Sequence, residues 1–397
     1  MGGNFKLSIK SNCIYILTCI IIFFASWENI NELRYYVVIP ILLLTWVLYF
    51  AYNGYKVNRL FIEKYTYSII IITTIAMPSL FNIYPHKDNI DYSYISFTIA
   101  TAVKIFMILS IMQFVKFDKK SICKLFEFLL LINVSFFIIQ FSTVYLTGYY
   151  IDPLVPLTGE PQRYLSGFSI PIIGQIYRPT GFYEEPSTYA AFILCFIACK
   201  FYLDKKVDKL VIVSIISMLL TLSVAAIFYV TVLMFFLFVV KKKGYLSYLI
   251  LILSPVFILA LFYFAEARLN AIGDATDIRG NLFVFVFNQD LLEILFGNGI
   301  LGVPSTLASF ILDRNLWSIG VASINDNGIW LYLIIKFGII GCFLFVMTCL
   351  KVMKTREDKL LFLILMTTKL SVLYFSFLFY LMIILLIKVG GFKYERA

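Results

Sequence analysis

Long apolar stretches separated by short charged segments recur along the whole chain. Apolar runs of about 17 or more residues begin at Ile14 and continue into the C-terminal part, and a helix of that length crosses the roughly 30 Å hydrocarbon layer of a membrane. The pattern predicts an all-α integral membrane protein. We expect a polytopic bundle of about twelve transmembrane helices, within a range of roughly ten to twelve, in a single transmembrane domain over residues 1–397.

Composition excludes a soluble protein. Hydrophobic residues make up 61% of the chain and charged residues 14%, against about 45–50% and 25% in soluble domains. The first apolar run lacks a small-residue cleavage site, so we expect a retained helix rather than a signal peptide. The seven cysteines lie in or beside apolar runs, which argues against a disulfide framework and a metal site.

Basic residues form clusters that alternate with the apolar runs. The net charge of +10 is spread over these clusters, so it sets orientation and does not indicate nucleic-acid binding. By the positive-inside rule 23 basic residues and both termini are cytoplasmic. The clusters are Lys6 and Lys10; Lys56, Arg59 and Lys64; Lys116, Lys119, Lys120 and Lys124; Lys200, Lys205, Lys206 and Lys209; Lys241, Lys242 and Lys243; Lys351, Lys354, Arg356 and Lys359; Lys388, Lys393 and Arg396.

The alternation requires two short helices in each of two apolar stretches. Residues 210–240 and 360–387 are each flanked on both sides by lysines predicted to be cytoplasmic, so each must cross the membrane twice or re-enter it. We expect the turns at Ser223 and at Lys369–Ser371.

Two long segments are predicted on the outside. Residues 147–186 hold six of the eleven prolines, which predicts an ordered, non-helical cap. Residues 265–326 contain an apolar stretch, Asn281 to Phe296, that predicts a helix lying in the membrane interface.

Arginine is favoured over lysine on the outside. Six of the seven external basic residues are Arg, against three of the 23 internal ones. Orientation needs only positive charge, whereas the guanidinium group offers a rigid fork of donors that matches phosphate and carboxylate. The bias therefore indicates an anionic ligand, and pairing with external acids is the alternative for any single residue. The external residues are Arg34, Lys87, Arg163, Arg178, Arg268, Arg279 and Arg314.

The end of the first external segment combines charge with backbone-fixing residues. The run Arg178-Pro-Thr-Gly-Phe-Tyr-Glu-Glu-Pro-Ser187 leads directly into an apolar stretch. Ser187 is a candidate helix cap, with the carboxylates of Glu184 and Glu185 at the electropositive helix end. A capped helix start explains Glu185 and Ser187 but leaves Arg178 unexplained.

The second external segment carries two further motifs. Gly297-Asn-Gly-Ile-Leu-Gly302 is either a weak phosphate-binding loop or a strip that lets helices approach closely. Asp326-Asn327-Gly328 precedes an apolar stretch, where Asp326 is either functional or a helix cap. Lys104, Lys336 and Lys369 fall within apolar stretches, where we expect a cavity, an acidic partner or the interface to accommodate them.

These motifs resemble those of the O-antigen polymerases (Wzy type) within the O-antigen polymerase and ligase superfamily. The carrying residues are 178–187, the glycine strip, and Asp326-Asn-Gly-Ile-Trp-Leu-Tyr-Leu-Ile-Ile-Lys-Phe-Gly-Ile-Ile-Gly341. The resemblance implies a GT-C-like fold in the bacterial inner membrane with two large periplasmic loops. It implies a metal-independent glycosyltransferase, without a cofactor, that joins undecaprenyl-pyrophosphate-linked oligosaccharide repeats. Donor and acceptor repeats, membrane lipids and a chain-length regulator protein are the expected partners.

Site roles follow from the resemblance and from charge. Arg178 and Arg279 are expected on the pyrophosphate, with Glu185 or Asp326 as the general base. The expected substrate-binding residues are Arg163, Glu184, Arg314, Asn327 and Lys104, with Glu184 positioning Arg178. Related ligases carry a histidine where this chain has Asp326-Asn327, which favours polymerase over ligase, and many members have an acid where Lys336 stands.

Two alternatives stay open. An O-antigen ligase shares the loops and arginines but is expected to carry that histidine. A lipid-linked oligosaccharide flippase would explain intramembrane lysines, but it predicts small loops and internal symmetry.

Overall fold

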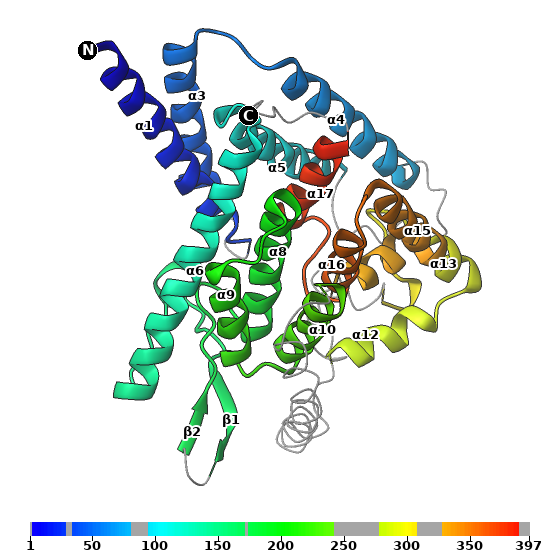
Figure 1. Cartoon of the computed structure of the whole chain (residues 1–397). Helices are drawn as coiled ribbons and strands as arrows, with labels where there is room; N and C mark the ends of the chain where they lie inside the picture. The colour runs from blue at the N-terminus through cyan, green and yellow to red at the C-terminus, as the bar shows by residue number, and fades with distance from the viewer. Residues whose placement is uncertain are drawn as a thin grey trace.

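Helices dominate the computed structural model, which describes residues 2–28, 34–80, 94–170, 174–241, 278–307 and 328–388 (Figure 1). Arg314, Asp326 and Asn327 lie outside these ranges. In chain order the helices are α1 (Gly2–Ala25), the π turn Arg34–Val38, α3 (Ile39–Asn53), α4 (Arg59–Leu80), α5 (Tyr94–Phe114), α6 (Lys119–Thr147), α7 (Val155–Thr158), α8 (Pro186–Asp204), α9 (Lys209–Leu220), α10 (Val224–Lys241), α12 (Ile278–Phe287), α13 (Leu291–Phe296), the 3₁₀ turn Ser305–Leu307, α15 (Ile329–Val352), α16 (Arg356–Met366) and α17 (Phe375–Lys388). One antiparallel pair of strands, β1 (Leu165–Ile170) and β2 (Gly174–Tyr177), completes the described part.

Six of the described helices are long and apolar enough to cross a membrane. They are Tyr36–Asn53, Arg59–Met77, Tyr94–Phe114, Lys119–Thr147, Pro186–Asp204 and Ile329–Val352. Four shorter apolar helices accompany them, Asn12–Ala25, Lys209–Leu220, Val224–Met234 and Phe375–Lys388. The prediction of a helical membrane protein is confirmed.

Helix α8 lies at the centre of the bundle, with α6, α9, α10, α16 and α17 packed around it (Figure 1). In the apolar part of α8, 89% of the residues are buried, whereas in the apolar part of α4 only 11% are buried. The reason is its sequence, which is apolar on all sides, and such a helix is stable only when it is surrounded. The start of α8 is therefore held firmly by its neighbours.

Both predicted pairs of short helices are present. In the first stretch α9 ends at Leu220 and α10 begins at Val224, so the turn includes Ser223. In the second, α16 ends at Met366 and α17 begins at Phe375, so the turn includes Lys369.

The chain brings predicted cytoplasmic segments together at one end of the bundle. Lys200 Nζ, near the end of α8, lies 3.5 Å from Glu127 Oε1 in α6, 2.5 Å from Asp204 Oδ2 and 2.9 Å from Asp208 Oδ2 before α9. Lys205 pairs with Asp358 at the start of α16. We call this the lysine end.

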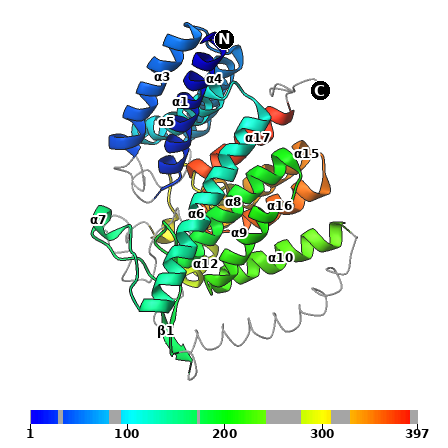
Figure 2. The ribbon, with the colours of Figure 1, turned by 60° about the vertical axis from the view of Figure 1, so that its left-hand side comes forward.

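The opposite end carries β1, β2, the start of α8 and the turn between α16 and α17, and we call it the hairpin end. Figures 1 and 2 agree in placing the hairpin far from the start of α1 and the end of α17. The first long segment is largely non-helical, as predicted, apart from the single turn α7.

Two local predictions are wrong. Residues 281–296 form two helices, α12 and α13, because Asn288–Asp290 interrupt the apolar pattern and Asp290 takes the N-cap position of α13. Ser187 is not the cap of α8, since the helix begins at Pro186 with Glu185 at the N-cap position. Pro is favoured at the first helical position because its missing N–H is not needed there.

The glycine strip packs against a kink in α15. Asn298 N and Asn298 Nδ2 both donate to Ile335 O at 3.0 Å, and Lys336 Nζ donates to Gly302 O at 2.7 Å. A Cβ added at Gly297 would lie 2.5 Å from Gly338 N, and Gly338 has φ 69° and ψ −179°. These contacts support the close-approach role for the strip, and they give Lys336 a structural partner.

We expect Gly338→Ala to destabilise the protein. The new Cβ would lie 2.2 Å from Leu295 O, at a backbone conformation that only glycine adopts readily. Gly54→Ala is the matched control, because Gly54 has φ 70° and ψ 177° with no atom within 4 Å of the added Cβ. Both variants carry the same backbone strain, so the steric clash alone should make Gly338→Ala less stable by about 1–3 kcal/mol.

Stability is measured in detergent with a thiol-reactive dye that reports exposure of the buried Cys195 and Cys199. Equal unfolding midpoints for the two variants would contradict the packing described for the strip.

Candidate functional site

A buried amide side chain organises the segment that leads into α8. Gln140 of α6 donates through Nε2 to Ile151 O at 2.7 Å and Gly181 O at 3.1 Å, and its Oε1 accepts from Gly181 N at 2.7 Å. Gln162 Nε2 donates to Gly181 O and to Tyr183 O, at 3.0 and 2.7 Å. Buried amides that are fully hydrogen-bonded fix the backbone around them. The position of residues 178–185 is therefore set from within the bundle.

Gly181 is required at the centre of this network. Its φ is +62°, and a Cβ there would lie 2.8 Å from Cδ2 of Tyr189. The left-handed backbone and the tyrosine ring together leave room for glycine alone.

Glu185 is held by two cations from distant parts of the chain. Its Oε1 lies 2.5 Å from Arg163 Nη1, and its Oε2 forms an ion pair with Lys369. Ser187 Oγ donates to the same carboxylate at 3.2 Å. The three charged side chains join the segment of residues 147–186, the start of α8 and the turn between α16 and α17.

Arg178 lies at the end of β2 in the same region. Its backbone N donates to Tyr164 O at 2.6 Å, and its Nη2 donates to Leu165 O at 3.0 Å. The guanidinium group therefore contacts the first residue of β1. The predicted contact with Glu184 is not among the ion pairs of the described residues, and the backbone of Glu184 accepts from Arg163 N at 2.8 Å instead.

The two adjacent carboxyl groups have pKa values shifted in opposite directions. Burial raises the pKa of Glu185, but the charges of Lys369 and Arg163 outweigh burial and hold it below its ordinary value. Partial desolvation raises the pKa of Glu184, and the negative charge of Glu185 adds to that rise. Neighbouring acids with divergent pKa values are typical of sites where one group is a fixed charge and the other accepts a proton.

Lys104 has an acidic partner inside the bundle. Its Nζ lies 3.1 Å from Glu28 Oε2 and donates to Leu373 O at 2.7 Å. Glu28 also accepts from the backbone N of Phe375. Lys104 therefore ties α5 to the end of α1 and the start of α17, and of the three predicted surroundings the structure shows an acidic partner.

The remaining predicted residues are not brought into this cluster. Arg279 lies in the first turn of α12, and the structure describes its backbone only. Arg314, Asp326 and Asn327 fall outside the described residues, so their roles stay predictions.

One group in the described part has metal-binding geometry. Cys123, Glu127 and Asp204 place ligand atoms within 4.8 Å of one another at the lysine end. The ammonium group of Lys200 already lies against both carboxylates. A cation is thus supplied by the chain itself, and the donor set does not fit a metal ion.

Lys369 and Gln140 were not among the predicted site residues. A lysine in a short turn between two apolar helices on the predicted outer side was a usable signal for Lys369. Gln140 gave none, since a single amide in a long apolar helix does not identify its partners.

Comparison with known proteins returned no match: neither a protein-family model, nor a curated protein, nor a solved structure is significantly similar to the chain.

Proposed function

We propose that this chain is a glycosyltransferase that joins undecaprenyl-pyrophosphate-linked oligosaccharide repeats into O-antigen or a similar surface polysaccharide. The observation that supports this most is the cluster at the hairpin end. Arg163, Arg178 and Lys369 gather there beside Glu184 and Glu185, where α8 enters the bundle. Cations fixed at a membrane boundary suit a lipid-borne pyrophosphate.

The proposal includes an orientation. The lysine end would face the cytoplasm and the hairpin end the periplasm, in accordance with the positive-inside rule. Eleven of the described helices would be spans: α1, α3, α4, α5, α6, α8, α9, α10, α15, α16 and α17. The twelfth span is a prediction from the apolar sequence of residues 246–264, which lie outside the described residues. We propose a GT-C-like arrangement for them.

In the proposed reaction an acceptor hydroxyl attacks the anomeric carbon of the donor glycan. The bond from that carbon to the pyrophosphate oxygen breaks, a new carbon–oxygen bond to the acceptor forms, and the hydroxyl proton passes to a carboxylate. The lipid pyrophosphate leaves with additional negative charge. Arg178 and Arg279 would stabilise that charge as it develops, with Arg163 and Arg314 as further contacts.

The structure favours Glu184 over Glu185 as the proton acceptor in the first segment. Glu185 is engaged by Lys369 and Arg163, which makes its carboxylate a weak base. Glu184 is exposed at the surface and has a raised pKa. A general base works best when its pKa approaches the operating pH. Asp326 stays the alternative base.

This division of roles predicts a pH dependence. Glu184 accepts a proton only when ionised, so activity should be full above its raised pKa and fall as the pH drops through it. Glu185→Gln removes a neighbouring negative charge that raises the pKa of Glu184. The acid limb of the rate profile should therefore move to lower pH in Glu185→Gln, and it should disappear with the activity in Glu184→Gln. If the acid limb of the rate profile did not shift in Glu185→Gln, a group other than Glu184 would be responsible for that limb.

The polymerase proposal is tested in cells that lack the gene. Deletion should leave a single repeat on the lipid A core, and the wild-type gene should restore a glycan ladder on a gel. Long polymer held on the carrier lipid would indicate a ligase. Repeats that accumulate on the cytoplasmic face would indicate a flippase, although the Glu28–Lys104 pair already accounts for Lys104 without transport.

A further inference from the structure

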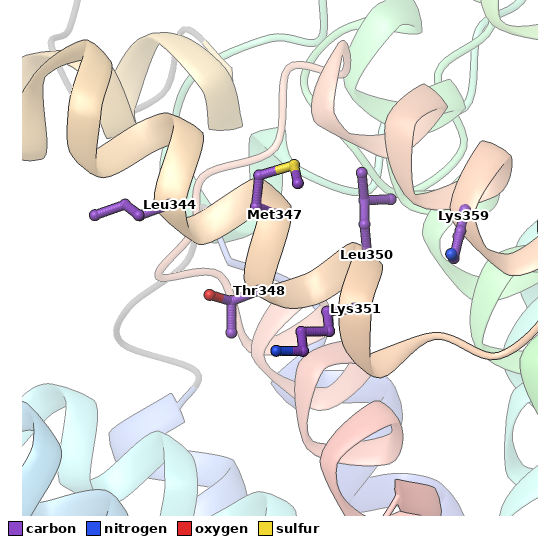
Figure 3. A pocket seen from close by; sticks show the side chains of 6 residues that line it. All are labelled: Leu344, Met347, Thr348, Leu350, Lys351 and Lys359. Atoms are coloured by element: carbon purple, nitrogen blue, oxygen red, sulfur yellow. The ribbon is translucent and has the colours of Figure 1, made fainter.

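A pocket opens at the end of α15, at the opposite side of the bundle from the proposed catalytic cluster. Its volume is about 440 Å³. Figure 3 shows the six lining side chains, of which five come from α15 and one from α16. They are Leu344, Met347, Thr348, Leu350, Lys351 and Lys359.

The pocket lies on an apolar outer surface. Beyond the kink at Gly338, α15 exposes large apolar side chains, among them Phe343 at 61%, Leu344 at 58% and Met347 at 49%. A continuous apolar surface of this kind in a membrane protein faces lipid acyl chains. The pocket is thus open to the hydrocarbon layer on one side.

The polar side of the pocket carries two ammonium groups. Two other lysines at the lysine end are paired with acids: Lys200 contacts three carboxylates and Lys205 pairs with Asp358. Lys351 and Lys359 form no ion pair within the described ranges of the chain. Within the described part of the chain, no carboxylate therefore neutralises their charge.

We propose that this pocket binds the headgroup of an anionic glycerophospholipid. The phosphate would lie beside Lys351 and Lys359, with the hydroxyl of Thr348 as a further donor, and an acyl chain would follow Leu344 and Met347. An apolar lining with one lysine from each of two helices is complementary to such a lipid, and anionic lipids are attracted to basic residues at the membrane surface. The inference requires only that the protein lies in a membrane.

The test compares lipid retention by native mass spectrometry of the full chain in detergent. Phosphatidylglycerol and phosphatidylcholine are added in turn to the wild type and to the Lys351→Gln, Lys359→Gln double variant. We expect the wild type to prefer phosphatidylglycerol, and we expect the double variant to lose that preference about tenfold.

The matched control is Lys120→Gln, Lys354→Gln, which removes the same charge from exposed side chains outside the pocket. It should keep the preference of the wild type. Equal losses in both double variants would mean that net charge alone attracts the lipid, and the proposal would be wrong. Complete displacement of phosphatidylglycerol by inorganic phosphate would also overturn the proposal, because the site would then recognise a free anion.

The lipid site and the proposed glycosyl transfer can fail separately. The Lys351→Gln, Lys359→Gln variant should still make a glycan ladder, since neither lysine belongs to the hairpin end. Loss of lipid preference in a variant that keeps its ladder would establish the site whatever the enzyme's substrate is.

Discussion

Replacing Arg178 by alanine is expected to reduce polymer formation by about 100- to 1000-fold, the usual effect of removing one donor that stabilises charge in a transition state. The fold should tolerate the change. The backbone of Arg178 still donates to Tyr164 O, and loss of the side-chain hydrogen bond to Leu165 O costs about 1 kcal/mol. The readout is the glycan ladder, with protein amount and unfolding midpoint measured alongside.

Two further variants identify the cause of the loss. Arg178→Lys keeps the charge but loses the fork of donors, so it should restore only a small part of the activity. Arg356→Ala removes an exposed arginine at the lysine end and should leave the ladder intact. A normal ladder in Arg178→Ala would remove this arginine from the site.

Replacing Lys104 by methionine is expected to destabilise the protein by about 3–5 kcal/mol, as is usual when one partner of a buried ion pair is removed. The side chain of Glu28 is 2% exposed, and Lys104 Nζ lies 3.1 Å from its carboxylate. Methionine keeps the length of the side chain but takes the positive charge away. The dye-based unfolding midpoint in detergent should fall strongly.

The double variant Glu28→Gln, Lys104→Met is the control for this prediction. It removes both charges, and the amide can still accept the hydrogen bond from the backbone N of Phe375. We expect it to recover most of the lost stability. If Lys104→Met instead keeps wild-type stability and loses only the ladder, then Lys104 binds substrate, as the sequence alone had indicated.

Much of the fold follows from hydropathy and charge. Apolar length predicts the spans, and the alternation of lysine clusters predicts one short helix on each side of Ser223 and one on each side of Lys369. Both features can be predicted from local sequence. The length of an apolar run decides whether it can span the membrane, and the free-energy cost of placing charge in lipid decides where the run must end. The interruption at Asn288–Asp290 is also present in the sequence, and in the structure it separates α12 from α13.

The candidate site depends on contacts that local sequence does not encode. Lys369 and Glu185 are separated by 184 positions and Lys104 and Glu28 by 76, so only the packing of α5, α8 and α17 brings them together. A carboxylate before a helix gives no indication of whether its partner is a substrate or a lysine of the same chain. For this reason the sequence is equally compatible with Glu185 as a general base and as a fixed negative charge, and only its neighbours in the structure distinguish the two.

The most direct test of the proposed function uses the purified protein in lipid nanodiscs with an undecaprenyl-pyrophosphate-linked repeat unit as the sole substrate. We predict a ladder of longer lipid-linked glycans with release of undecaprenyl pyrophosphate, unchanged by a metal chelator and absent with Arg178→Ala. A substrate that is recovered intact by the folded wild-type protein, under conditions in which the same gene restores the ladder in cells, would contradict the proposal that this chain itself forms the glycosidic bond.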